Sequence, residues 1–332
     1  MKIREHFKKK KYLVQLILTI AGFVCIPLIL SQMLIIERST QEYANLNEQS
    51  IREKLYSNFS YFKEEMSGLS YTAAKVSQDQ TIRAVAKGTA NEYEVYLAAN
   101  RIDEYSDGLW KAGVWFYESG HVLHNNVNLS LNQFCNRIAG ESTICSTALQ
   151  QFFQETESLE VFSTVKYSDI AQDVIIIAKP VSFRSALEKD ATVFFVAQHN
   201  ELEQNFSEVF RNKVGVALID PESNFLIQSE SFSGEWYSDA SFHKFLAEDS
   251  QNHCVVHIDG KNFKVYKYRD AASEYFYLVS IDEDDIGVQL RKHINSIQLV
   301  MVVSSILMIV LLVLIWNICL NYQLIHGQQR VV

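Results

Sequence analysis

The chain has 332 residues, of which 48% are hydrophobic and 21% charged, so it is long and apolar enough to bury a core. Acidic residues are concentrated between two uncharged runs. This middle region holds 38 of the 39 acidic and 23 of the 30 basic residues, a net charge of about −15. Such a surface argues against nucleic acid or anionic lipid as its partner, and solubility alone is enough to explain it.

Two uncharged runs, 12–36 and 297–320, predict membrane-spanning helices. Each exceeds the roughly 20 apolar residues that cross a bilayer as a helix. The first run is also too long for the apolar core of a cleaved signal peptide. Residues 1–11 are basic and are therefore expected in the cytoplasm, and a second span returns the tail, 321–332, to the same side. The sequence thus predicts a two-pass protein of the cell membrane with residues 37–296 outside the cytoplasm.

Residues 37–110 are expected to form a stalk and further helices. Apolar residues recur three and four positions apart, which is typical of one face of a helix continuing from the first span. This stripe consists of Leu55, Phe59, Phe62, Met66, Leu69, Ala73 and Val76. It either packs on the chain's own sheet, which we favour, or pairs with a second subunit as a coiled coil. A second helix is expected at about 91–105.

Residues 111–200 are rich in β-forming residues and predict a larger, distal sheet. The expected strands are 112–117, 121–124, 160–165, 173–179 and 192–198, with Pro180 ending the fourth and polar helix or loop over 132–157. Residues 201–281 predict a smaller, proximal sheet after a connecting helix at 201–212. Its expected strands are 214–220, 225–228, 254–258, 263–268 and 275–281, with a helix at about 239–249 and a hairpin turn at Asp259-Gly260.

Residues 282–296 are expected to form an exit helix that runs into the second span. The fold class is therefore α+β, with two antiparallel sheets in tandem between two transmembrane helices.

No nucleophile, phosphate-binding or dinucleotide motif occurs in the sequence, so we expect no enzyme and no cofactor. The nearest metal pattern is His253-Cys254-x-x-His257, whose histidines would lie about 13 Å apart on a strand, too far to share one ion. We therefore expect no metal site. Cys135 and Cys145 are ten residues apart in a polar stretch outside the cytoplasm, where a disulfide between them is as favourable as two free thiols.

Four segments, together with the order of elements, resemble the double Cache (tandem PAS-like) sensor regions of bacterial receptors. The resemblance is closest to Firmicute membrane-bound AraC-type regulators and two-component sensor histidine kinases. The segments are Phe62-Lys-Glu-Glu-Met66, Gly113-Val-Trp-Phe-Tyr117, Ala178-Lys-Pro-Val181 and Asn200-Glu-Leu-Glu-Gln-Asn-Phe206. Such relatives continue into a cytoplasmic output domain, whereas this sequence ends twelve residues after the second span. The chain is then a truncated gene product, a fragment of a longer receptor, or a stand-alone sensor that signals through a separate cytoplasmic protein.

The resemblance implies a small-molecule site in the distal sheet, between its central strands and the preceding loop. In this sequence the implied ligand-binding residues are Tyr105, Trp110, Trp115, Tyr117 and His124. The alternative is that these aromatic residues fill the core. The Arg-x-Trp-Tyr motif of amino-acid-binding members is absent, which makes a free amino acid a less favoured ligand.

We therefore expect a receptor that binds an extracellular solute, works as a homodimer and transmits a signal across the membrane. The alternative is a membrane-anchored interaction protein without a small-molecule ligand, which docks a partner through its acidic surface.

Overall fold

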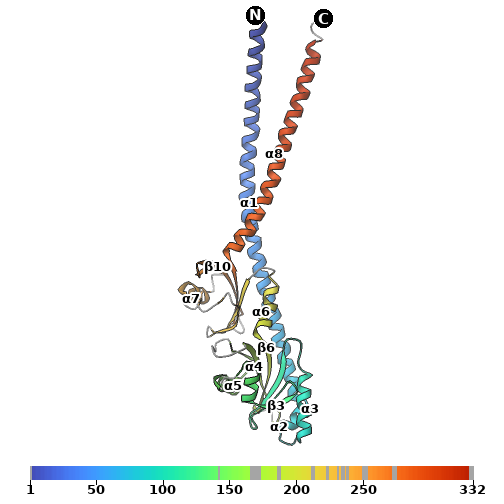
Figure 1. Ribbon diagram of the computed structural model, residues 1–332, viewed down its shortest axis with the longest axis vertical. Coiled ribbons are helices and arrows are strands. Elements are labelled where there is room, and N and C mark those ends of the chain that lie inside the picture. Colours follow the sequence, from blue (N-terminus) through green and yellow to red (C-terminus); the bar gives the residue numbers. More distant parts are fainter. Residues whose placement is uncertain are drawn as a thin grey trace. The chain divides into compact units, whose positions relative to one another are not determined.

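The computed structural model (Figure 1) describes residues 2–140, 143–164, 173–184, 188–210, 214–221, 224–229, 232, 236, 239–248, 253–270 and 275–328. Side chains near the two ends, including nearly all of the first 29, lie outside this description, as do those of 139 and 143–145. The chain divides into two compact units, Ile51–Glu283 and the paired ends Met1–Ser50 with Asp284–Val332. The fold is α+β, with a long N-terminal helix and two antiparallel sheets, as predicted.

The N-terminal helix α1 runs from Lys2 to Gln78, so the predicted first span and the stalk are one helix. Its apolar stripe is buried against the chain's own sheets, apart from Met66, which is half-buried. Phe59 contacts Tyr268 and Tyr277, and Phe62 contacts Phe206. The favoured prediction for the stripe is thus confirmed.

Two short helices follow the stalk. Helix α2 (Gln80–Ala86) begins where the carboxylate of Asp79 accepts backbone hydrogen bonds from Thr81 and Ile82. Helix α3 (Glu92–Asp103) begins with a capping box between Asn91 and Glu94, within the helix predicted at 91–105.

A six-stranded antiparallel sheet has the order β3-β2-β1-β6-β5-β4. Its strands are β1 (Lys111–Phe116), β2 (His121–His124), β3 (Val127–Ser130), β4 (Glu160–Ser163), β5 (Val174–Val181) and β6 (Ala191–Gln198). Helices α4 (Leu131–Ala139) and α5 (Thr143–Glu155) pack on the face that carries Trp115 and Phe194. The opposite face meets the stalk, where Lys179 donates to the hydroxyl of Ser70.

Two features of this sheet differ from the sequence prediction. Strand β5 does not end before Pro180 but continues to Val181, with Pro180 opposite Thr192 of β6. Strand β4 begins opposite Ala178 and does not reach Pro180, so β5 has only one neighbour there and the missing N–H is tolerated. Strand β3 was not predicted, because its alternation of half-buried and exposed residues is short and weakly apolar.

A five-stranded antiparallel sheet has the order β8-β7-β11-β10-β9. Its strands are β7 (Val214–Ile219), β8 (Phe225–Gln228), β9 (His253–Ile258), β10 (Lys261–Arg269) and β11 (Phe276–Asp282). Helix α7 (Ala240–Ala247) covers one face, where Phe232, Trp236, Phe242 and Phe245 fill the core. The predicted hairpin turn at Asp259-Gly260 is present, with both residues at positive φ.

Helix α6 (His199–Glu208) connects the two sheets. Near its end, Phe206 packs against Phe62 of the stalk and Tyr277 of β11, and its carbonyl accepts a hydrogen bond from Asn58. The imidazole of His199 accepts a hydrogen bond from the backbone N–H of Gln228 in β8. This one helix therefore contacts both the stalk and the second sheet.

Helix α8 runs from Glu283 to Gln328 and begins directly after β11. Its part Glu283–Leu311 is long and apolar enough to cross a membrane, and among the described side chains it is the one helix that meets this criterion. Within the unit formed by the chain ends, His293 of α8 stacks on Tyr43 with ring centroids 4.4 Å apart and lies 3.3 Å from the hydroxyl of Ser39. The apolar part of the first predicted span lies almost wholly outside the described side chains, so that span and the orientation of the termini stay predictions.

Candidate functional site

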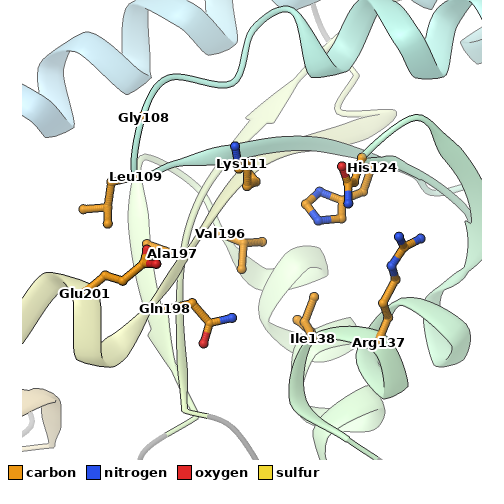
Figure 2. A pocket seen from close by; sticks show the side chains of 11 residues that line it. Gly108, Leu109, Lys111, His124, Arg137, Ile138, Val196, Ala197, Gln198 and Glu201 are labelled. Carbon is orange, nitrogen blue, oxygen red and sulfur yellow. The ribbon is translucent and has the colours of Figure 1, made fainter.

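A cavity of about 450 Å³ lies where β1 begins and β6 ends, on the face of the six-stranded sheet that α4 covers (Figure 2). This size suits a small organic ligand. The lining residues are Gly108, Leu109, Lys111, His124, Asn125, Arg137, Ile138, Val196, Ala197, Gln198 and Glu201. They come from the loop before β1, from β1, β2, β6, α4 and α6, so segments far apart in the sequence build one site.

Local sequence explains how these side chains are placed. Strands β2 and β3 are joined by Asn125 and Asn126, whose φ angles of 50° and 62° suit a two-residue hairpin turn. This turn ends β2 at His124 and holds Asn125 at the cavity. Helix α4 begins with a capping box between Ser130 and Gln133, which positions Arg137 in its last turn.

The cavity has an apolar floor and a polar rim. Ile138, Val196 and His124 are buried, whereas Lys111 and Arg137 are exposed. The remaining polar lining residues, Asn125, Gln198 and Glu201, are exposed or half-buried. Figure 2 shows Arg137 and Glu201 on opposite sides, with Val196 and the imidazole of His124 between them. A floor of this kind suits a hydrocarbon group, and the rim suits charged or hydrogen-bonding groups.

His124 is the buried polar group of the cavity, with 5% of its surface exposed. Its Nδ1 lies 3.0 Å from the carbonyl oxygen of Ala112. A carbonyl only accepts, so Nδ1 carries the hydrogen and Nε2 carries the lone pair. Burial lowers the pKa of His124, and the charges of Arg137 and Lys111 lower it further, against the opposing effects of the Ala112 hydrogen bond and the Asp103 carboxylate. The ring is therefore neutral at neutral pH.

Two positive charges and one negative charge border the cavity. Lys111 and Arg137 line the same cavity as His124, and the charges of both lower its pKa. Neither forms an ion pair or hydrogen bond with any residue in the described part of the chain. Glu201 stands at the third position of α6, where the positive end of the helix dipole stabilises a carboxylate.

The five residues that the resemblance implied do not come together. His124 lines the cavity, and the other four do not. Trp110 is buried and its indole N–H lies 3.5 Å from Glu65 of the stalk, while the hydroxyl of Tyr105 donates to Asp79 at 3.1 Å. Both therefore lie toward the stalk and α2.

Trp115 and Tyr117 belong to the core beneath α5. Their rings are 4.9 Å apart, and the ring of Trp115 is 5.6 Å from Phe153. The hydroxyl of Tyr117 donates to the carbonyl of Phe153 at 3.1 Å, and burial raises its pKa. This packing agrees with the alternative that these aromatic residues fill the core. A ligand-binding role for Trp115 and Tyr117 stays a prediction.

Sequence analysis missed the charged and amide residues of the rim. Lys111, Arg137, Gln198 and Glu201 lie on four elements and have no common spacing. One local signal was available, because Asn125-Asn126 between two apolar runs favours a tight hairpin turn. Cys135 is buried in the core cluster, and the side chain of Cys145 lies outside the description, so their disulfide stays a prediction.

No protein-family model matches the sequence, and no curated protein is significantly similar to it. Among solved structures, the sensory domain of the Campylobacter jejuni chemoreceptor Tlp3 with isoleucine bound is similar at 13% identity and a TM-score of 0.47. The similarity covers 76% of this chain and 98% of that one. The ligand-binding domain of the Pseudomonas fluorescens chemoreceptor CtaA with L-serine is similar at 12% identity and a TM-score of 0.49, covering 73% and 99%.

The extracellular domain of the histidine kinase candidate rpHK1S-Z16 is similar at 10% identity and a TM-score of 0.48, covering 74% of this chain and 96% of that one. All three neighbours are sensory, ligand-binding or extracellular domains. Likeness at these identities and TM-scores assigns neither a ligand nor a function to this chain.

Proposed function

We propose that this protein is a membrane-anchored receptor that binds a small extracellular solute in the cavity between β1, β6 and α4. We also propose that it acts as a homodimer and signals through a separate cytoplasmic protein. On the basis of the short sequence segments, we propose that it is related to AraC-type regulators and histidine kinases. The residues that we propose as its binding site are Lys111, His124, Arg137, Gln198 and Glu201.

One observation carries this proposal. The cavity of about 450 Å³ combines a buried apolar floor with charged side chains that have no protein partner among the described residues. Charged side chains without ion-pair partners around an apolar cavity are typical of a ligand site, because a bound ligand can form those ion pairs or hydrogen bonds. The five-stranded sheet differs, since Trp236 and three phenylalanines fill the space beneath α7.

Helix α6 supplies a route from the cavity to the rest of the unit. Gln198 and Glu201, at its start, line the cavity, and Phe206, near its end, packs on the stalk and on β11. A ligand that binds one position of α6 more tightly than another would shift the balance between them. Because β11 leads directly into α8, that shift would reach the predicted second span through the backbone.

Thermal unfolding of the full chain in lipid nanodiscs, with a panel of sugars, organic acids, amines and amino acids, tests this proposal. A solute at 100 times its dissociation constant adds about 2.7 kcal/mol of stability, which raises the melting temperature by a few degrees. We expect one class of solute to produce such a shift.

A steric block supplies the matched control. Gln198→Trp places a large ring at the cavity and should abolish the shift. Gln204→Trp, in the following helix α6 but outside the cavity, should preserve it. If no solute stabilises a protein that unfolds cooperatively, the receptor proposal fails, and docking of a partner protein becomes the better interpretation.

A further inference from the structure

The two unpartnered cations beside the cavity favour an anionic ligand. Lys111 is the first residue of β1, and Arg137 lies in the last turn of α4. Both charges act on the buried ring of His124. A carboxylate that approached this side of the cavity would accept charge-assisted hydrogen bonds from both, and an arginine fork can hold it with two parallel bonds.

Glu201 does not require a positive group on the ligand. It stands on the other side of the cavity from Arg137 (Figure 2), in the first turn of α6, where the helix dipole already stabilises a negative charge. Among the charged lining residues, the two cations of the rim outnumber this one carboxylate. The cavity therefore favours an anion over a zwitterion or an amine.

The imidazole of His124 can accept a hydrogen bond from a ligand. Its Nδ1–H donates to Ala112, which leaves a lone pair on Nε2 at the cavity. No residue that the structure describes donates to this atom. Nε2 is not one of the described buried atoms without a partner, so it is open to the cavity, where a ligand hydroxyl can replace water as its hydrogen-bond donor. Because both cations line the same cavity as His124, we place that hydroxyl next to the carboxylate.

The floor defines the rest of the ligand. Val196 and Ile138 are buried apolar residues of the cavity, and they suit a short hydrocarbon chain. We propose that the cavity binds a small 2-hydroxycarboxylic acid, with its carboxylate between Lys111 and Arg137 and its hydroxyl donating to Nε2 of His124. This inference rests on the proposed receptor function and names the class of its ligand.

The proposal can be tested with four probes on the full chain in lipid nanodiscs. One is a 2-hydroxy acid, and each of the other three differs from it by one group. They are 2-hydroxy-4-methylpentanoate, 4-methylpentanoate, 2-hydroxy-4-methylpentanamide and leucine, measured by calorimetric titration and thermal shift. We expect the hydroxy acid to bind best. Loss of the hydroxyl, loss of the negative charge, or replacement of the hydroxyl by an ammonium group should each weaken binding about tenfold or more.

Variants locate the carboxylate. Lys111→Gln and Arg137→Gln are exposed substitutions and should each weaken binding of the hydroxy acid about tenfold or more, without lowering the melting temperature of the free protein. Lys87→Gln, an exposed cation outside the cavity, should leave binding unchanged.

Three results would overturn this inference. They are equal or tighter binding of the amide or of leucine, unchanged affinity in both cation variants, and no binding by any 2-hydroxy acid of about three to nine carbons. If another class of solute then stabilises the protein and Gln198→Trp abolishes the effect, the receptor proposal stands and only the ligand class falls. If nothing stabilises the protein, both fall.

Discussion

Gly113 allows the aromatic core of the six-stranded sheet to close. A Cβ atom at this position would lie 2.3 and 2.4 Å from ring atoms of Phe194, on the neighbouring strand β6. That ring is fully buried, 4.9 Å from the ring of Phe134 and 5.1 Å from that of Phe153. It therefore has no room to move. The rings of Phe134 and Phe194 also lie beside the imidazole of His124, with centroid distances of 5.2 and 6.0 Å.

Replacing Gly113 by alanine should destabilise the protein by about 1–3 kcal/mol, because an added methyl group overpacks a core that cannot relax. Gly68→Ala is the matched control. Gly68 lies in the exposed interior of α1 with nothing near its Cβ position, so alanine there should stabilise by about 0.5–1 kcal/mol. Chemical denaturation measures both, and equal effects of the two substitutions would contradict the packing argument.

At the scale of elements, α6 is held at both ends by contacts with other segments. His199 joins it to β8, and the side chain of Asn58, which is 4% exposed, joins it to the stalk. The bond from Nδ2 of Asn58 to the carbonyl of Phe206 is 2.8 Å long. This carbonyl lies in the last turn of the helix, where acceptors lack partners within the helix.

Asn58→Ala should cost about 1–3 kcal/mol of stability, because it leaves the buried carbonyl of Phe206 unpaired. Hydrogen exchange should also speed up in the last turn of α6 and stay unchanged in α7. Ser57→Ala, at the exposed neighbouring position, is the control and should change neither quantity. Unchanged exchange in α6 with Asn58→Ala would show that this hydrogen bond does not hold the last turn of the helix.

Most elements could be predicted from local sequence, and the reasons are visible in particular residues. Capping at Asn91 and Asp239 and the Asp259-Gly260 turn are local signals, and each marks an element boundary in the structure. The continuation of β5 through Pro180 could not be predicted, because the tolerance of proline depends on where the neighbouring strand β4 begins. That information is tertiary.

At the scale of the whole molecule, the sequence predicted a solute site in the distal sheet, and the cavity found there is lined mostly by residues other than the predicted ones. Aromatic residues were expected around the ligand, and the cavity instead takes Lys111, Arg137 and Glu201 from three separate elements. Aromatic strand residues pack a core as readily as they line a pocket, so composition alone does not distinguish the two. Only His124 was identified in advance among the lining residues.

The stability of the Ile51–Glu283 unit should depend on pH through its buried histidines. Burial lowers the pKa of His199 and of His124 below the ordinary value of about 6.5. As pH falls, the unfolded chain takes up protons first, so stability that is complete above about pH 6.5 is lost as the pH falls toward the folded-state pKa values.

Denaturant unfolding between about pH 7.5 and 5 should therefore show a falling free energy of unfolding for the unmodified protein. His199→Gln should flatten this dependence, and His121→Gln, at an exposed position of β2, should leave it intact. A pH dependence that is identical in all three proteins would assign the effect to other groups.

The junction between β11 and α8 limits the motions that this protein can use. Strand β11 is the central strand of its sheet, paired with β10 from Phe276 to Asp282 and with β7 from Phe276 to Ile281. The next residue, Glu283, already belongs to α8. No linker residue separates the strand from the helix along the chain. Inserting two or three glycines after Asp282 would supply such a linker, and a receptor of this design would then bind its solute with unchanged affinity yet remain silent.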